Sequence, residues 1–363
     1  MKGARRLILS LWLLAATLVV RASDKALLIE IEPRTQLFPS GVSASGAVLA
    51  GSLDGGGGFY WMPTTGVIFN GGNAAANVSR DGRTIVGSAV DSRGIVQAAI
   101  WQRAAEWQLL GSFGPGAAPC DRSLSSASDT SSDGRVVVGL AQNGCTLAHA
   151  FRWEESTGIV DLGSSVAGRD SSARAVSGDG RVVVGFQERS DGTRQGARWV
   201  DGRQELVPSP AGSVSGFVGD ANSTNHDGSI VVGRICRFGN PLDQSAWVWT
   251  PGEGIRCLPA PALRPSPGPV IITDANGLSD DGRIVGGRQG VASSNDSDAV
   301  IWIDGTPSYL KDYLRANGIP DAFERWINTG TITDVSPDGR ILVGYGAALG
   351  GFRGYIVILG EQP

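Results

Sequence analysis

Few side chains in this sequence are of the types that carry out chemistry, and their spacing limits what they can do. The chain has two histidines, His149 and His226, in different parts of the sequence. No His/Cys spacing beside them matches a zinc site, and no Gly-x-Ser-x-Gly phrase marks the nucleophile of a Ser-His-Asp triad. We therefore expect no metal, no cofactor and no catalytic residue of these kinds.

A repeated carboxylate is the next candidate. Variants of the phrase Ser-x-Asp-Gly-x-x-x-Val-Gly occur seven times, and six of them carry an Asp-Gly pair. Calcium loops need several oxygen ligands at alternating positions, whereas each of these phrases supplies one carboxylate. Asp-Gly between apolar runs is typical of a tight turn, because Gly takes the positive φ and Asp bonds nearby N–H groups. We expect structural turns, without metal, at Asp81-Gly82, Asp133-Gly134, Asp179-Gly180, Asp227-Gly228, Asp281-Gly282 and Asp338-Gly339.

Arginine and aromatic residues in the variable part of each repeat are the candidate binding residues. Insertions on a repeated scaffold are where function usually lies. The alternative is ordinary solvated loop decoration. The candidates for contact with a ligand or partner are Arg93, Arg189, Arg194, Arg237, Phe238, Phe352 and Arg353.

The repeat itself predicts the elements that position these residues. One strand ends at the Ser, the Asp-Gly turn follows, and a β-branched run such as Val182-Val183-Val184 forms a second strand. A variable loop leads to a third strand, and a short fourth strand ends the unit. Four short strands at a period of roughly 45 to 55 residues are typical of a β-propeller blade. In six units a Trp in the third strand occupies one equivalent place, where we expect packing between blades rather than sugar stacking: Trp61, Trp101, Trp153, Trp199, Trp249 and Trp302.

We therefore predict an all-β fold, a seven-bladed propeller of four-stranded antiparallel blades within residues 24–363. The repeats begin near residues 41, 74, 126, 172, 218, 272 and 330. The last unit stops after three strands, and an open sheet edge is a liability, so we expect the strand at 26–32 to complete it. A helical periodicity after Pro307 predicts a small helical insert near 307–327 that packs against the propeller.

These units resemble the extracellular HAF repeat, a bacterial family named for a His-Ala-Phe triplet. One literal copy is His149-Ala150-Phe151, and the Asp-Gly-x-x-x-Val-Gly and small-x-x-Trp halves recur over nearly the whole chain. The resemblance implies a secreted β-propeller. It implies no established activity and carries over no catalytic residue.

The first 22 residues have the pattern of a secretory signal peptide. Lys2, Arg5 and Arg6 precede an uncharged apolar run, and cleavage is expected after Ala22. Cleavage would change the formal net charge from −4 to −8, which argues against nucleic acid as a partner. We expect a secreted or periplasmic monomer with no integral membrane span after cleavage, and a protein or glycan partner outside the cytoplasm.

Four cysteines in an exported chain predict two disulfides. In the blade model all four lie on the face that carries the loops between second and third strands, in two groups. We expect the pairs Cys120–Cys145 and Cys236–Cys257.

Two functional hypotheses follow. The first is a non-enzymatic binding scaffold whose contact surface is the face bearing those loops. The alternative is a carbohydrate-active hydrolase or lyase. It would need carboxylates, or Tyr and Arg residues, that converge on the same face from different blades.

Overall fold

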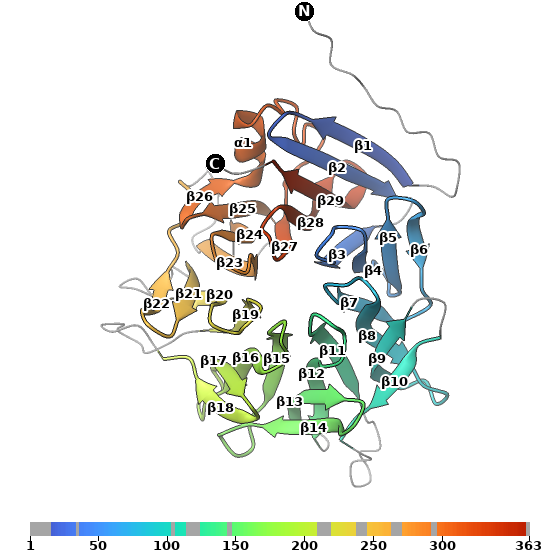
Figure 1. The fold of residues 1–363 in the computed structure, drawn as a ribbon, viewed down its shortest axis with the longest axis vertical. Helices are drawn as coiled ribbons and strands as arrows, with labels where there is room; N and C mark the ends of the chain where they lie inside the picture. The colour runs from blue at the N-terminus through green and yellow to red at the C-terminus, as the bar shows by residue number, and fades with distance from the viewer. Residues whose placement is uncertain are drawn as a thin grey trace, which may run out of the picture.

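The structure is a computed structural model, and it describes residues 16–33, 36–102, 106–113, 124–143, 147–208, 219–236, 245–262, 271–291 and 296–360. These residues form seven antiparallel blades in a ring around a central axis (Figure 1), and a pairing between Arg234 and Asp274 joins the fifth and sixth blades into one eight-stranded sheet. The all-β, seven-bladed propeller predicted from the repeats is confirmed. No helix among the described residues is long and apolar enough to cross a membrane.

Each blade runs outward from an inner strand in chain order. The first three blades are β3 (Leu37–Val42), β4 (Leu49–Leu53), β5 (Gly58–Met62) and β6 (Gly66–Phe69); β7 (Ala74–Val78), β8 (Thr84–Val90), β9 (Val96–Gln102) and β10 (Gln108–Gly111); and β11 (Ser125–Thr130), β12 (Val137–Asn143), β13 (Leu147–Glu154) and β14 (Gly158–Gly163).

The next three blades are β15 (Ser171–Val176), β16 (Val182–Glu188), β17 (Arg194–Val200) and β18 (Arg203–Leu206); β19 (Ala221–Thr224), β20 (Val231–Cys236), β21 (Ser245–Thr250) and β22 (Gly254–Cys257); and β23 (Ile271–Leu278), β24 (Ile284–Val291), β25 (Ser297–Ile303) and β26 (Thr306–Tyr309). The first inner strand begins at Leu37, before the repeat boundary at residue 41. The other inner strands begin within three residues of their repeat boundaries.

The seventh blade joins both ends of the chain. Strands β27 (Thr331–Val335), β28 (Ile341–Ala348) and β29 (Gly351–Leu359) are continued by β2 (Ala26–Pro33), which pairs antiparallel with β29 from Ala26↔Leu359 to Ile31↔Gly354. The N-terminal strand therefore closes the ring, as predicted. A further strand, β1 (Ala16–Ala22), pairs with β2 on the outside. It lies within the segment predicted as a signal peptide, whose cleavage would leave four strands in this blade.

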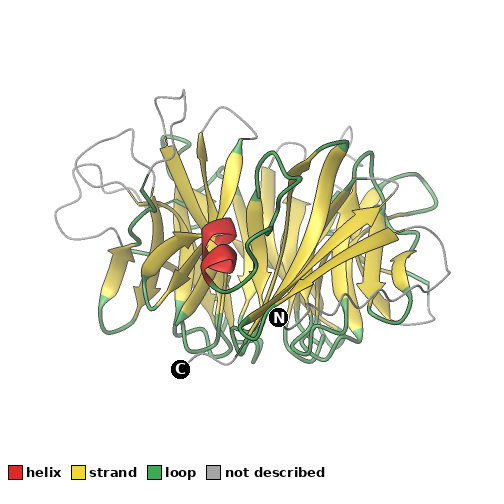
Figure 2. Ribbon diagram, turned by 90° about the horizontal axis from the view of Figure 1, so that it is seen from above, coloured by secondary structure: helices red, strands yellow, loops and turns green. Residues whose placement is uncertain are grey.

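Two faces of the ring differ in their connections. Because neighbouring strands are antiparallel, the Asp-Gly turns between first and second strands lie on one face, here named the turn face, together with the ends of the third strands and the starts of the fourth. The ends of the second strands and the starts of the inner and third strands lie on the opposite face, here named the loop face; Figure 2 shows the ring from its side. Second strands such as β16 are buried along most of their length, which suits their β-branched residues.

The core lies between the blades. The six equivalent Trp side chains are at most 8% exposed. Trp199 packs with Val136, Val138 and Ala150 of the preceding blade. These tryptophans are wedges between adjacent sheets, so they are not available for sugar stacking.

The predicted helical insert is present as α1 (Leu310–Ala316). Its buried residues Leu310 and Leu314 join Phe323 and Trp326 in a cluster against the seventh blade. The Trp326 indole also donates a hydrogen bond of 3.0 Å to the buried Glu30 of β2. The insert is thus part of the packing that closes the ring.

Candidate functional site

A cavity of about 640 Å³ lies on the axis of the ring. Residues of all seven inner strands line it, together with residues in the second halves of four second strands, so it lies toward the loop face. Its size lies in the range of small-molecule binding sites.

A bulge in every inner strand shapes the floor of the cavity. The register between first and second strand shifts at the same place in each blade. Several bulged side chains donate to the next inner strand, for example Asn222 Nδ2 to Ala275 O at 2.9 Å and Thr333 Oγ1 to Pro39 O at 3.0 Å. The bulged residues are Ser40, Ala76, Ser128, Arg174, Asn222, Asn276 and Thr333, all of which line the cavity.

One side of the cavity carries arginines from three successive blades. Three of them surround Asp220, whose side chain is fully buried. Arg234 Nη2 lies 2.8 Å and Arg174 Nη2 3.1 Å from Asp220 Oδ2, while Arg194 Nη1 lies 3.6 Å away. Arginines that share one carboxylate leave positive charge for a ligand.

The fourth arginine extends this charge to the next blade. Arg288 Nε donates to Asp274 Oδ2 at 2.7 Å. We name this set the arginine half: Arg174, Arg194, Arg234 and Arg288 with Asp220 and Asp274. Four guanidinium groups against two carboxylates give it a net charge of +2 in a chain whose net charge is −4.

The arginine half is electrostatically crowded. Burial lowers the pKa of the Arg174 guanidinium; Asp220 opposes this shift, whereas the charges of Arg234 and Arg194 add to it. The Arg194 guanidinium also lies 4.1 Å from the centroid of the Phe186 ring. Asp220 Oδ1 and Arg234 Nε are buried without a hydrogen-bond partner. A bound anion would relieve both the repulsion and part of this unmet hydrogen bonding.

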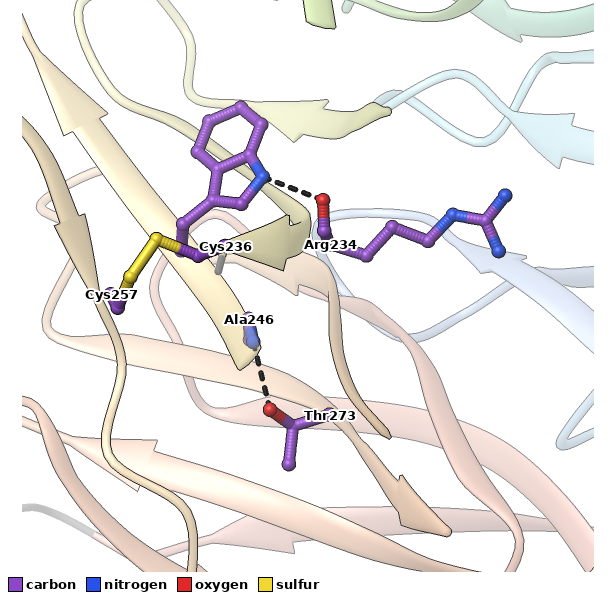
Figure 3. Close-up of a disulfide and its surroundings, with 6 residues drawn as sticks. Arg234, Cys236, Ala246, Cys257 and Thr273 are labelled. Carbon is purple, nitrogen blue, oxygen red and sulfur yellow. Dashed lines mark hydrogen bonds between the residues drawn. A yellow bond between two sulfur atoms is a disulfide. The ribbon is translucent and has the colours of Figure 1, made fainter. Parts of the chain in front are cut away.

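The strand that carries Arg234 is held by unusual means. Ile235 has φ +66°, which is strained for a β-branched residue. The Trp247 indole donates to Arg234 O at 2.8 Å, and the disulfide Cys236–Cys257 fixes the end of the strand (Figure 3). The backbone of Arg234 also pairs with Asp274 of the next blade. These contacts fix the backbone from which Arg234 reaches into the cavity.

The opposite side of the cavity is aromatic. Phe38 of β3 packs edge-on against Tyr345 of β28, with centroids 5.0 Å apart, and lies 5.3 Å from Phe352 of β29. The rings of Tyr345 and Phe352 are 6.2 Å apart. Phe38 and Tyr345 line the cavity directly. We name these three residues the aromatic half.

Toward the turn face the axis narrows to a cavity of about 70 Å³. Two enclosed carboxyls lie there. Burial raises the pKa of Asp129 to about 7 and that of Asp334 to about 6. Hydrogen bonds from the backbone N–H of Val176 to Asp129, and from that of Val42 to Asp334, oppose these shifts. Beyond them, Arg80 and Asp280 form a two-pronged ion pair across the axis, both N–O distances being 2.7 Å.

The residues predicted as ligand contacts divide into three groups. Arg194 belongs to the arginine half and Phe352 to the aromatic half, although neither is among the residues that line the cavity itself. Arg93 pairs with Asp91, Arg189 donates to Gln195, and Arg353 donates to the carbonyl of Leu349. Arg237 and Phe238 lie outside the described residues.

One of the two predicted disulfides lies within the described residues. Cys236–Cys257 is confirmed, with the Cα atoms 5.8 Å apart. Cys120 and Cys145 lie outside the described residues.

The Asp-Gly turns use their carboxylates internally. In one, Ser79 Oγ donates to Asp81 Oδ1 at 2.6 Å, Arg83 N donates to the same oxygen at 2.9 Å, and Thr84 N donates to Ser79 Oγ. Gly82 has φ +72°. The same bonds recur at Ser131/Asp133, Ser177/Asp179, Ser279/Asp281 and Ser336/Asp338.

Sequence reasoning missed most of the cavity. The cavity residues lie within strands rather than in the variable loops, apart from Asp220, which directly precedes β19: Phe38, Arg174, Arg234, Asp274, Arg288 and Tyr345. A positional signal was nevertheless present. The residue directly after the second repeated glycine is Ser52, Ser88, Leu140, Phe186, Arg234, Arg288 and Tyr345 in the seven units. Because this position varies within an otherwise regular repeat, it indicates where individual blades contribute different side chains.

Comparison with known proteins shows a shared fold. The sequence matches no family model and no curated protein. An oligogalacturonate lyase from Vibrio parahaemolyticus is similar over 96% of this chain and 98% of its own, with 13% identity and a TM-score of 0.56. An oligogalacturonate lyase in complex with manganese covers 96% and 97%, with 14% identity and a TM-score of 0.54. A prolyl endopeptidase matches 81% of this chain over 49% of its own length, with 9% identity and a TM-score of 0.51.

The side chains of this cavity do not fit a manganese ion. Across the described ranges, no three or more His, Cys, Asp or Glu side chains are grouped so that they could hold a metal. The carboxylates of the arginine half, Asp220 and Asp274, are both ion-paired with arginine. We derive no step through a metal.

These findings contradict our expectation of a non-enzymatic scaffold. The propeller is shared over nearly its whole length with two enzymes. Tyr and Arg residues from different blades do converge on the loop face, as the alternative hypothesis requires.

Proposed function

We propose that this chain is a carbohydrate-active enzyme that cleaves an acidic oligosaccharide in the axial cavity by β-elimination. The arginine half carries the proposal. Guanidinium groups bind carboxylates in a planar, two-pronged manner, and here several approach one cavity from three blades. The solved structures with this fold that are named as oligogalacturonate lyases act on a substrate of this charge.

The reaction follows from the chemistry of a bound uronate. Pairing the carboxylate with arginines makes the hydrogen on the adjacent carbon, C5, more acidic. A base removes that proton, the electron pair forms the C4–C5 double bond, and the C4–O bond breaks as the leaving oxygen takes a proton. No water is consumed, and one product carries an unsaturated sugar.

Tyr345 is the residue to which we assign proton transfer. Among the ionisable side chains that line the cavity, it is the one that is not part of an arginine–carboxylate ion pair. Hydrolysis by a carboxylate pair is less consistent with this site, because Asp220 and Asp274 are already committed to arginines.

An activity assay tests the proposal. The purified chain is incubated with oligosaccharides of galacturonate, glucuronate, mannuronate and guluronate, and products are followed by ultraviolet absorbance and mass. We expect unsaturated products from at least one. Saturated products with new reducing ends would show that the reaction is hydrolysis rather than elimination. If none of the acidic oligosaccharides is cleaved, the proposal is overturned.

Tyr345→Phe separates the chemical step from binding. It keeps the ring and removes the hydroxyl, so we expect kcat to fall about 100-fold with little change in KM. An unchanged kcat would exclude Tyr345 as the group that transfers the proton.

We also propose that the chain is an exported protein of the HAF-repeat type, with residues 1–22 as its signal peptide. A disulfide is compatible with an oxidising compartment. Loss of β1 on cleavage would remove the ion pairs that Arg21 makes with Glu30 and Asp321, while Trp326 would still donate to Glu30. N-terminal sequencing of the protein recovered outside the cytoplasm tests this; a chain that retains Met1 there would contradict cleavage.

A further inference from the structure

The aromatic half has a different character from the arginine half: Phe38 and Tyr345 line the same cavity, and Phe352 packs against both rings. Phe38, Tyr345 and Phe352 are each half-buried, so part of every ring is accessible. They contact one another at centroid distances of 5.0 to 6.2 Å. Rings that brace one another are held in place before a ligand arrives, which reduces the entropy lost on binding.

Polar groups surround these rings. Four hydroxyl-bearing residues line the cavity on this side, and because each hydroxyl donates to a backbone carbonyl, it can only accept a hydrogen bond from a ligand: Ser40, Ser52, Thr331 and Thr333. An apolar ring face next to hydroxyl groups matches a sugar, which offers C–H groups on one face and hydroxyls around its edge. Among the residues that line this side of the cavity, no cationic side chain is present to pair with a second carboxylate of the ligand.

We propose that the aromatic half is a stacking subsite for the neutral ring face of a neighbouring sugar, next to the uronate whose carboxylate the arginine half binds. This inference rests on the proposed function. It adds that a ligand longer than one sugar is oriented across the mouth of the cavity, with its anchoring carboxylate toward the fourth to sixth blades and its stacked ring toward the seventh and first blades.

The test compares ligands of two lengths. Binding of monomers and trimers of galacturonate, glucuronate and mannuronate is measured by calorimetry on the purified chain and on Phe38→Ala, which removes a ring that lines the cavity. We expect the trimer to bind the native chain more tightly than the monomer. Phe38→Ala should lose about tenfold in trimer affinity, equal to about 1.4 kcal/mol, and keep the monomer affinity.

Two further variants serve as controls. Phe38→Trp keeps a large ring and should retain the trimer affinity, which excludes general damage to the blade. Phe69→Ala removes an exposed Phe on an outer strand, 59% accessible, and should change neither affinity.

Each outcome separates the two proposals. If Phe38→Ala binds the trimer as the native chain does, the stacking subsite is wrong and the arginine half stands. An equal loss for monomer and trimer would also overturn the subsite, because one uronate would then account for the whole contact. If the native chain binds none of the monomers or trimers, the proposed function itself fails.

Discussion

The two ends of the axial channel are built from the same repeat in opposite ways. At the turn face, the Ser and Asp of five of the six Asp-Gly units bond to each other and to the turn backbone, and Asn225 takes the place of the Ser in the sixth. Arg80 pairs with Asp280 across the axis. At the loop face, the position after the second repeated glycine varies from Ser to Phe, Arg and Tyr. The repeat positions whose side chains stabilise the turns are therefore nearly constant, whereas the position after the second repeated glycine varies and contributes side chains to the cavity.

The largest effect on function is expected at the loop face. Arg234→Met removes one of the guanidiniums from the arginine half and leaves the buried Asp220 with fewer partners. Truncating one partner of a buried, hydrogen-bonded charge pair costs about 2–5 kcal/mol, so affinity for an acidic oligosaccharide should fall at least about 30-fold. Calorimetry with the ligand that the activity assay identifies measures this.

A matched arginine serves as its control. Arg283 pairs with Asp304 at 2.9 Å, but both side chains are more than half exposed. Surface pairs contribute about 0–1 kcal/mol, so Arg283→Met should leave ligand affinity unchanged. Equal losses in the two variants would show that the effect is not specific to the cavity.

The largest effect on stability is expected at the turn face. Gly228 has φ +73°, and a Cβ there would lie 2.4 Å from Val182 Cγ2. Gly228→Ala should therefore lower the free energy of unfolding by about 2–4 kcal/mol, combining backbone strain with crowding, and leave ligand affinity intact. Chemical denaturation and calorimetry measure the two quantities.

Gly202 isolates the backbone contribution. Its φ is +79°, but a Cβ there would meet nothing within 4 Å. Gly202→Ala should cost about 1–2 kcal/mol. If it costs as much as Gly228→Ala, the contact with Val182 is not what makes the repeated glycine necessary.

The buried carboxyls predict how stability changes with pH. Burial raises the pKa of Asp129 to about 7 in the folded state, above its usual value of 3.8. Between these values the folded chain binds more protons than the unfolded chain, so this contribution to stability is fully present below pH 3.8 and is lost as pH rises through about 7. Asp129→Asn should flatten the fall in denaturation midpoint between pH 4 and 8; an unaltered slope would assign it to other groups.

A smaller effect on function is expected from the support of Arg234. Trp247→Phe removes the indole N–H that bonds to Arg234 O, and should weaken ligand binding about three- to tenfold. Trp302→Phe removes a comparable bond to Pro259 O, 2.7 Å long, outside the arginine half, and should leave affinity unchanged. Similar affinities in both variants would show that Arg234 does not depend on Trp247.

The sequence was sufficient to predict the ring but not its cavity. Asp-Gly turns, β-branched second strands and equivalent tryptophans are local signals repeated seven or six times, so they predict the blades and the closure by residues 26–32. Which strand residues meet on the axis depends on the bulge in each inner strand, as at Arg174 and Asn222, and that register shift has no separate sequence signal. The variability of the loops led us to propose Arg93 and Arg189, and neither is among the residues that line the cavity.

The central claim is that the arginine half binds a carboxylate on a sugar. The most direct measurement is calorimetric binding of the acidic trimer that the chain cleaves, compared with its methyl ester, which keeps the rings and removes the charge. The claim predicts that the acid binds, that its affinity falls as salt is added, and that the ester binds at least about 100-fold more weakly. Equal binding of acid and ester would contradict it.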